Sequence, residues 1–335
     1  MVSVGTGAGG AGLTRKPIVL TPTIKSGPGF GRTIYVDFDA GNDANDGLTT
    51  STPWRSLDYL ETNKQAGDLI YMKGTTSGAN SYFGKGTTAG TSSAWITYTL
   101  WPSGTLTIMN GGLPNGYNAI YGANLVYHCF YNLPLDGAPG AGLGWDGGPL
   151  ARITGSSNVW VIGCAFNNAG FSCINTPDCR LYDNTWRGTY GDFRTPALGG
   201  NTGDMCYMSN SSHRFWLIRN NFDCLSGHGC CDLANPQTGS TVCDDAYVFD
   251  CYFRNVAAGG LFVVGDARNA IVEWNVMDSM ATEIGASSDP GSTDGCQLTA
   301  PGTIFRFNIV KNNHRHGILM DSTEAFGGQF SKDNH

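Results

Sequence analysis

The sequence predicts an all-β solenoid in which short strands stack coil upon coil. Glycine is abundant, with 48 residues among 335, and only 14% of the residues are charged, against about 25% in ordinary soluble domains. Helical periodicity is nearly absent, and short β-type runs are separated by Gly, Asn, Asp and Ser. A hexapeptide pattern also recurs from the middle of the chain onward. Internal repetition of this kind indicates a repeat architecture rather than two ordinary domains.

Residues 1–32 are predicted to form an extended, Gly- and Pro-rich basic arm. The segment contains no acid and four basic residues, Arg15, Lys16, Lys25 and Arg32, so the rest of the chain carries 16 basic against 27 acidic residues. We expect the arm to lie along the acidic body of the chain, a neighbouring subunit or another acidic surface, and a partner subunit is favoured. Because no basic region precedes an apolar stretch, we expect no secretory signal.

Residues 33–74 are predicted to cap a solenoid that extends over residues 33–335, and to supply its first coil. Thr33–Asp37 has the composition of a strand, an Asp/Asn/Gly turn follows at 41–47, and 67–71 begins a second strand. Residues 56–65 form the one credible helix, with Ser56 as its N-cap. A helix here would cover the open end of the first coil, where backbone edges are exposed.

A hexapeptide of the form apolar-x-x-(Asn or Cys)-x-apolar is predicted to mark the same corner of successive coils. A small polar residue between two short strands can hydrogen-bond the backbone of the turn and stack on its equivalent in the next coil, forming a ladder. Cys can replace Asn as a small side chain that prefers burial. The predicted ladder residues are Cys129, Cys164, Asn184, Asn220, Cys251, Asn275 and Asn308.

Several hexapeptides are followed by a further apolar run that a glycine opens, at 229–233, 260–264, 295–298 and 317–320. Three short strands per coil, with tight glycine corners and an apolar lumen, predict a single-stranded right-handed parallel β-helix. Variable loops between the hexapeptides are compatible with this fold, because solenoids tolerate insertions where the coils bulge outward. After residue 322 only a short tail remains, in which Phe326 and Phe330 could cover the last coil.

Over roughly residues 33–322 the chain resembles the right-handed parallel β-helix, or pectin-lyase-like, superfamily, and within it most resembles phage virion β-helix proteins. The resemblance rests on the strand, turn, helix and strand between Thr33 and Tyr71 and on the stacked hexapeptides. The superfamily contains polysaccharide lyases, glycoside hydrolases and non-enzymatic virion proteins, so the fold leaves function open.

Two groups of residues are weak candidates for catalysis. Ser226-Gly-His228-Gly229 with Asp244 and Asp245 resembles elements of polygalacturonase-like hydrolases, in which two carboxylates act as acid and base. The order of these elements is reversed here, which favours a loop histidine and turn carboxylates. His314, Arg315 and His316 could supply a base beside a cation, as a lyase requires, although a surface loop is the favoured interpretation.

Several other polar and aromatic groups are more readily explained by structure than by function. Acidic residues near the ends of successive apolar runs could form a stripe that binds a cation or acts on sugars, and an Asp/Asn cluster near residue 40 could bind calcium. In both cases the favoured interpretation is that the side chains serve turns. Exposed tryptophans could bind sugars, although most aromatic residues of such a fold fill its lumen. The stripe would consist of Asp232, Asp266, Asp294 and Asp321, and the Asp/Asn cluster near residue 40 consists of Asp37, Asp39, Asn42, Asp43, Asn45 and Asp46. The tryptophans are Trp54, Trp101, Trp145 and Trp160.

The 11 cysteines cannot all pair within one chain. Those at ladder positions are expected to be buried thiols. In an oxidising medium, disulfides are plausible among Cys224, Cys230, Cys231 and Cys243, and between Cys173 and Cys179. The spacing does not match a zinc site, and we expect no metal and no cofactor.

Two function classes follow from these observations. The favoured one is a structural virion protein of a tailed phage, a head decoration, cement or tail-associated protein that attaches through its arm. We expect it to form a homo-oligomer, a trimer by resemblance, and to contact other virion proteins such as the capsid. The alternative is an extracellular polysaccharide lyase or glycoside hydrolase acting on an acidic glycan. No membrane or nucleic-acid partner is expected, since no stretch approaches the roughly 20 apolar residues of a membrane span.

Overall fold

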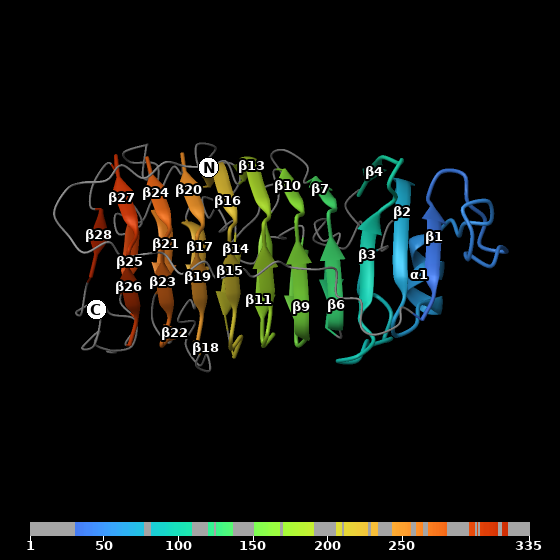
Figure 1. The fold of residues 1–335 in the computed structure, drawn as a ribbon, viewed down its shortest axis with the longest axis horizontal. Coiled ribbons are helices and arrows are strands. Elements are labelled where there is room, and N and C mark those ends of the chain that lie inside the picture. Colours follow the sequence, from blue (N-terminus) through green and yellow to red (C-terminus); the bar gives the residue numbers. More distant parts are fainter. Residues whose placement is uncertain are drawn as a thin grey trace, which may run out of the picture.

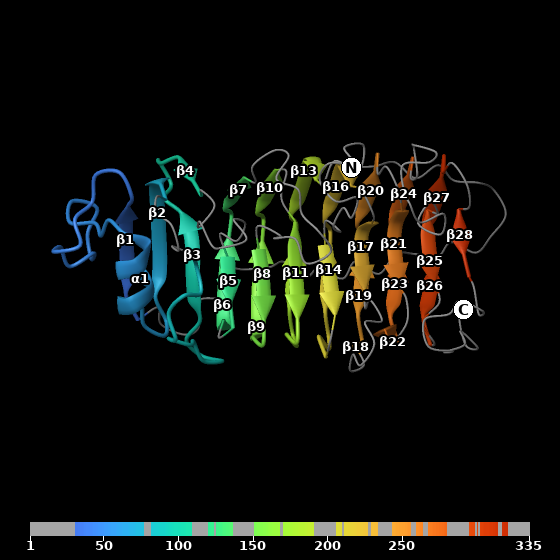
Figure 2. The ribbon, with the colours of Figure 1, turned by 180° about the vertical axis from the view of Figure 1, so that it is seen from behind.

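The computed structural model is an elongated stack of coils, each built from short parallel strands (Figures 1 and 2). The structure describes residues 31–76, 82–108, 120–123, 125–136, 151–167, 170–190, 206–209, 211–226, 229–233, 243–255, 259–263, 267–279, 295–298, 300, 302–313 and 317–320. The predicted fold class is confirmed: the chain folds as a right-handed parallel β-helix. The arm as far as residue 30, with Arg15, Lys16 and Lys25, lies outside the described residues, as do Phe326 and Phe330.

Three parallel sheets run along the stack, and from residue 126 onward each coil contributes one strand to each sheet. Sheet 1 contains β1 (Thr33–Asp37), β2 (Leu69–Thr75), β3 (Ile96–Leu100), β6 (Val126–Tyr131), β9 (Ser157–Ile162), β12 (Arg180–Tyr182), β15 (Trp216–Ile218), β19 (Tyr247–Phe249), β23 (Ile271–Glu273) and β26 (Ile304–Arg306), and β4 (Leu106–Thr107) pairs with β2. Sheet 2 contains β7 (Pro134–Asp136), β10 (Ala165–Asn167), β13 (Thr185–Tyr190), β16 (Asn221–Ser226), β20 (Tyr252–Arg254), β24 (Val276–Asp278) and β27 (Ile309–Lys311).

Sheet 3 closes each coil. Its strands are β5 (Ile120–Gly122), β8 (Ala151–Thr154), β11 (Phe171–Ile174), β14 (Cys206–Ser209), β17 (Gly229–Leu233), β21 (Gly259–Val263), β25 (Cys296–Leu298) and β28 (Ile318–Leu319). A further parallel pair, β18 (Cys243–Asp244) with β22 (Ala267–Arg268), precedes two strands of sheet 1. Because all these strands pair in register with the next coil, equivalent side chains form columns along the stack.

The predicted cap helix is present as α1 (Leu57–Asn63), and Ser56 is its N-cap. The Ser56 Oγ accepts a hydrogen bond from the Tyr59 N–H at 3.1 Å. Leu57 and Leu60 are buried. Capping and an apolar face therefore explain why this short segment is helical within an otherwise all-β chain.

A buried polar network fastens α1 to the coils beneath it. The Lys64 ammonium lies 2.6 Å from Glu61 Oε2 and donates to the Tyr98 hydroxyl at 2.9 Å, which in turn donates to Glu61 Oε1 at 2.8 Å. His128 stacks on Tyr98 with 6.1 Å between ring centroids, and its Nε2 is buried without a hydrogen-bond partner. Burial and the nearby Lys64 charge hold the pKa of His128 well below its usual value.

The lumen is filled by columns of apolar side chains. On sheet 2, Phe166, Trp186, Phe222 and Phe253 stack nearly parallel, with ring centroids 4.6, 4.3 and 4.9 Å apart along the column. Cysteines supply smaller fillers, and the nine whose side chains the structure describes are buried; of the candidates for disulfides among them, Cys173, Cys179 and Cys231 are thiols. The side chains of Cys224 and Cys230 lie outside the described residues.

Candidate functional site

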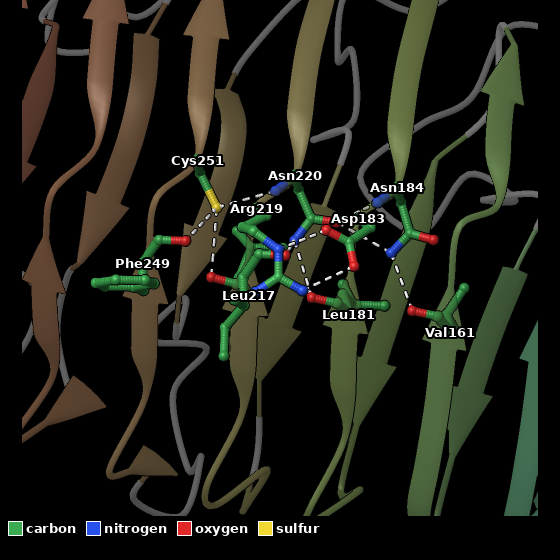
Figure 3. Close-up of polar contacts among 10 residues, drawn as sticks. Val161, Leu181, Asp183, Asn184, Leu217, Arg219, Asn220, Phe249 and Cys251 are labelled. Atoms are coloured by element: carbon green, nitrogen blue, oxygen red, sulfur yellow. Dashed lines mark hydrogen bonds and ion pairs between the residues drawn. The ribbon is translucent and has the colours of Figure 1, made fainter. Parts of the chain in front are cut away.

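The Asn/Cys ladder is the most regular polar feature of the molecule, and Figure 3 shows its centre. The backbone N–H of each member donates to the side chain of the next: Cys164 to Asn184 at 2.8 Å, Asn184 to Asn220 at 3.1 Å, and Asn220 to the Cys251 sulfur at 3.4 Å. The series continues in the next coils: the Cys251 N–H donates to Asn275 Oδ1 at 2.9 Å, and the Asn275 N–H donates to Asn308 Oδ1 at 2.9 Å. The ladder therefore ties together the corners between sheets 1 and 2.

Cys129 is not part of this ladder, which corrects one sequence expectation. Cys129 lies inside β6, where it pairs with Trp160 of the next coil. The ladder position of that coil is held by Leu133, whose N–H donates to the Cys164 sulfur at 3.4 Å. The residue just before each ladder position has a left-handed backbone, and in this coil that residue is Asn132, with φ of 53°. The hexapeptide around Cys129 fits the ladder pattern because residues within a strand and residues around a corner show the same alternation of buried positions.

The predicted catalytic candidates do not form one described site. His228, His314, Arg315 and His316 lie outside the described residues. Asp244 and Asp245 fall at the corner that precedes sheet 1. There they belong to an ionisable corner, which we define as Asp178, His213, Arg214, Asp244, Asp245 and Arg268.

Within the ionisable corner, Arg214 and Asp178 are already paired. Arg214 binds Asp178 with two hydrogen bonds, 2.7 Å from Nε and 2.6 Å from the terminal nitrogen. This guanidinium holds the pKa of the Asp178 carboxyl below its usual value, and Asp178 raises the pKa of Arg214. Both groups therefore stay charged and bound to each other, which withdraws the arginine from binding an acidic ligand.

His213 is the described histidine that lies beside a candidate acid. Its Nδ1 accepts a hydrogen bond from the Asp244 backbone N–H at 3.3 Å and lies 3.8 Å from the carboxylate oxygen Oδ2. With Nδ1 as an acceptor, the neutral ring carries its proton on Nε2. The pair could therefore exchange a proton with a bound molecule, but the carboxylate does not orient the imidazole as it would in a catalytic triad.

Oppositely charged side chains alternate along the stack, and the ionisable corner is one case of this pattern. Asp178, Arg214 and Asp245 stand six positions before successive ladder residues, and Asp183, Arg219 and Asp250 stand one position before them. Arg219 binds Asp183 through two hydrogen bonds of 2.6 and 2.8 Å (Figure 3). Such alternation is required because in-register coils about 4.8 Å apart would otherwise bring like charges together.

A third alternating column lies three positions after the ladder, on the outer face of sheet 2. Arg187, Asp223, Arg254, Asp278 and Lys311 are paired in register there. Arg254 forms an ion pair with Asp223, and Lys311 lies 3.1 Å from Asp278. His213, Arg214 and this alternation were missed at the sequence level, although fixed offsets from the ladder residues would have revealed them.

The acidic cluster near residue 40 is explained by turns. Asp43 accepts from the N–H groups of Arg55 and Ser56 at 2.8 and 2.9 Å, and Asp46 accepts from Leu48 N–H at 3.0 Å. Asp37 accepts from two further backbone N–H groups at 3.1 and 3.0 Å. Among the described residues no group of three or more possible ligands is placed to hold a metal ion. The side chains of Asp232, Asp266, Asp294 and Asp321 lie outside that part of the chain.

The outer face of sheet 1 carries a row of apolar and aromatic side chains, which we call the aromatic strip. Val161, Leu181, Leu217 and Val248 belong to the lumen cluster, so their neighbours in sequence point outward. The strip consists of Trp95, Tyr127, Cys129, Tyr131, Trp160, Ile162, Tyr182, Trp216, Ile218, Tyr247, Phe249 and Trp274. Arg180 lies between two of its indoles, with its guanidinium 5.0 Å from the Trp160 ring centroid and 4.1 Å from that of Trp216.

The tryptophans considered for sugar binding are divided between structural positions. Trp54 and Trp101 are buried, Trp160 belongs to the aromatic strip, and Trp145 lies outside the described residues. In the described part of the chain, no helix is long and apolar enough to cross a membrane.

Comparison with known proteins finds similar folds. No family model matches the sequence, and no curated protein matches it. Among solved structures, a GH136 lacto-N-biosidase from Eubacterium ramulus has 14% identity and a TM-score of 0.46 over 87% of this chain and 55% of its own. The surface adhesin PfbA of Streptococcus pneumoniae has 9% identity and a TM-score of 0.47 over 75% and 68%. A rhamnogalacturonan lyase has 15% identity and a TM-score of 0.39 over 88% and 86%.

The chain thus spans little more than half the length of the first of these structures. The class that the structure itself defines is the right-handed parallel β-helix. At such low identities the likeness concerns this fold, which serves enzymes and binding proteins alike.

Proposed function

We propose that this chain is a structural, non-catalytic virion protein of a tailed phage, a head decoration, cement or tail-associated protein that attaches through its N-terminal arm. The observation that carries this proposal is the alternation of charge from coil to coil. In each of the three columns described above, a basic side chain forms an ion pair with an acidic one of the neighbouring coil. Charges paired in this way keep like charges of adjacent coils apart and are not free to act on a substrate.

The composition of the arm supports attachment to another protein. Arg15, Lys16, Lys25 and Arg32 stand on a segment without acids, next to a body with a large acidic excess. Arg32 is held on the body by Asp68 at 2.8 Å, so the rest of the arm leaves from a fixed point. We further propose that the protein forms a homo-oligomer, a trimer by resemblance to virion β-helices, and contacts the capsid or other virion proteins.

Mass spectrometry of purified virions from the source culture tests this proposal. Peptides of this chain are expected in the particles at a stoichiometry typical of structural proteins, and light scattering of the purified full chain is expected to give an oligomer. If peptides of the chain are found only outside particles, the virion proposal is refuted.

The second candidate is a lyase or hydrolase that acts on an acidic polysaccharide outside the cell. The His213–Asp244 pair favours it, since a half-exposed imidazole lies beside a carboxylate there. The full chain would be incubated with a panel of acidic polysaccharides, and the released oligosaccharides measured by mass spectrometry. Release that is lost in both His213→Ala and Asp244→Asn would establish this candidate. No release, or release that both variants retain, would exclude it for this pair.

A further inference from the structure

The C-terminal end of the stack leaves lumen side chains exposed. In the described part of the chain, β26, β27 and β28 are the last strands of sheets 1, 2 and 3, and they lie at the opposite end of the stack from α1 (Figure 1). One coil earlier the lumen residues of the three sheets are 0% exposed, namely Val272, Met277 and Cys296. The residues that pair with them in the last coil are Phe305, Val310 and Ile318. Phe305 and Val310 are only partly buried, and Ile318 is 42% exposed.

Other apolar side chains of this last coil, which we call the terminal coil and define as residues 302–313 and 317–320, are exposed as well. Phe307 is 42% exposed, Ile309 49% and Met320 52%. With Ile318, they are four of the six exposed large hydrophobic side chains in the described part of the chain. Exposed apolar residues that gather in one place mark a surface on which another molecule packs.

The terminal coil also presents an unpaired strand edge. The Ile304 N–H donates to the Ala270 carbonyl at 2.8 Å, so Ile304 directs its backbone groups toward the preceding coil. Because successive residues of a strand direct these groups to opposite sides, the N–H and the carbonyl of Phe305 point away from the preceding coil. An edge of this kind is a template on which a further strand can pair.

The Asn/Cys ladder is incomplete at the same place. The side chain of Asn308 accepts from the Asn275 N–H at 2.9 Å, as in the earlier steps of the ladder. Among the described residues, the N–H of Asn308 has no acceptor of its own. One more coil with a small polar side chain at the ladder position would supply that acceptor.

The charge columns end on basic residues in the terminal coil. Arg306 lies 2.7 Å from Glu273 and Lys311 lies 3.1 Å from Asp278, so each is paired with the coil before it. Both basic side chains are nevertheless about half exposed. Within the columns an interior arginine stands between two acids, whereas residues 301–320 contain no acid. The terminal coil therefore favours an acidic occupant.

Charge and sequence discriminate between the occupants. A second copy stacked in the same direction would have to displace α1, and a second copy turned end to end would bring the basic residues of both terminal coils together. The tail of the chain does not match either, because none of its three acids, Asp321, Glu324 and Asp333, is five residues from another. Five residues separate Arg306 from Lys311. The occupant that fits is a segment of another protein.

We propose that the terminal coil binds an extended acidic segment of another protein, which adds to β26 and β27 as one further coil. Such a segment carries two acids five residues apart, which pair with Arg306 and Lys311. A small polar residue two positions after the first acid accepts from the Asn308 N–H. The inference goes beyond the virion proposal, which places attachment in the arm, and does not depend on it.

A peptide with the sequence of residues 270–279 serves as the probe, because that coil has the required pattern in Glu273, Asn275 and Asp278. The fluorescein-labelled peptide would be titrated with the full chain and followed by fluorescence polarisation. We expect saturable binding. A peptide of the same composition in scrambled order is the control for charge alone and is expected not to bind. No binding, or equal binding of both peptides, would overturn the proposal.

Two double variants locate the surface that binds the peptide. Arg306→Gln with Lys311→Gln removes both charges of the terminal coil and is expected to weaken binding at least tenfold. Arg187→Gln with Arg219→Gln removes two charges from the middle of the stack and is expected to leave the affinity unchanged. Circular dichroism verifies that both proteins are folded. Equal affinities of the two variants would contradict binding at the terminal coil.

Hydrogen exchange and sedimentation distinguish the competing occupants. The bound peptide is expected to slow exchange of the backbone N–H groups of residues 304–311 and to leave β6 and β9 unchanged; the reverse pattern would refute the proposal. Dimers of the full chain that dissociate in the Arg306→Gln, Lys311→Gln variant would assign this end to a second copy. Peptide binding that appears only after removal of residues 321–335 would assign it to the tail. Either result would overturn the proposal.

Discussion

The ladder makes a quantitative prediction at Asn220, which lies at the centre of Figure 3. Its Oδ1 accepts hydrogen bonds from the backbone N–H of Asn184 at 3.1 Å and from the Asn184 amide at 3.0 Å. Its own amide donates to the carbonyls of Leu181 at 2.9 Å and Ile218 at 3.1 Å. Asn220 is 1% exposed, so water cannot replace these partners without opening the coil.

The substitution Asn220→Ala removes the acceptor of two buried Asn184 donors, the backbone N–H and one N–H of the side-chain amide. Each unsatisfied buried donor costs about 1–3 kcal/mol, so we expect the free energy of unfolding to fall by about 2–6 kcal/mol. This is a large part of the roughly 5–15 kcal/mol that holds a typical domain together. The substitution Asn220→Cys is expected to cost less than half as much. The chain already uses Cys251 at an equivalent position, where the sulfur accepts from Asn220 N–H at 3.4 Å and donates to the Leu217 carbonyl at 3.3 Å.

Equilibrium urea unfolding, followed by circular dichroism, measures both variants. Asn221→Ala is the matched control, because this neighbour faces outward on sheet 2 and its Oδ1 has no hydrogen-bond partner. We expect the control to change the free energy of unfolding by no more than about 0.5 kcal/mol. A loss below about 1 kcal/mol in Asn220→Ala, or equal losses in the Ala and Cys variants, would show that the ladder does not act through its hydrogen bonds.

Four further predictions follow from the columns and the lumen. The folded-state pKa of His128 lies well below the 6.5 of the unfolded chain, so below pH 6.5 the unfolded state binds a proton that the folded state does not. The free energy of unfolding should therefore fall below pH 6.5 by up to about 1.4 kcal/mol per pH unit. Urea unfolding midpoints measured between pH 4 and 8 should show this dependence in the wild type, and a smaller dependence in His128→Phe. Trp186→Ala, which empties the centre of the aromatic column, should cost about 3–5 kcal/mol in urea unfolding; a loss below about 1 kcal/mol would mean that the column collapses to fill the gap. Arg219→Asp would place like charges in adjacent coils and should lower the thermal midpoint, with partial recovery in high salt or in the double variant with Asp183→Arg; an unchanged midpoint would contradict a stabilising role for charge alternation. Burial raises the pKa of Cys164 to about 12, so a thiol reagent should label this residue only after unfolding, and labelling of the native protein, mapped by mass spectrometry, would contradict its placement.

Much of the candidate site could not be predicted from the sequence, and the ionisable corner illustrates why. Asp244 and Asp245 are adjacent acids in the sequence, but in the structure they have different neighbours. Asp244 lies beside His213 of the preceding coil, whereas Asp245 continues the column of Asp178 and Arg214. The partners of a side chain in a solenoid are set by the neighbouring coil, about 20–36 residues away in this chain. Adjacent residues therefore say little about which charges meet.

The sequence by itself determined the solenoid, the capping helix with Ser56, and six of the seven ladder residues proposed, because small polar residues at tight corners have few alternatives. Only the tertiary structure decided the register of the coil that contains Cys129, where Leu133 takes the ladder position. It also decided that Trp274, at the corner predicted from Asn275, adopts a left-handed backbone with φ of 61°, which a tryptophan does not favour. The physical reason is the same in both cases: stacking on the neighbouring coils fixes the corner, and local preferences yield to it.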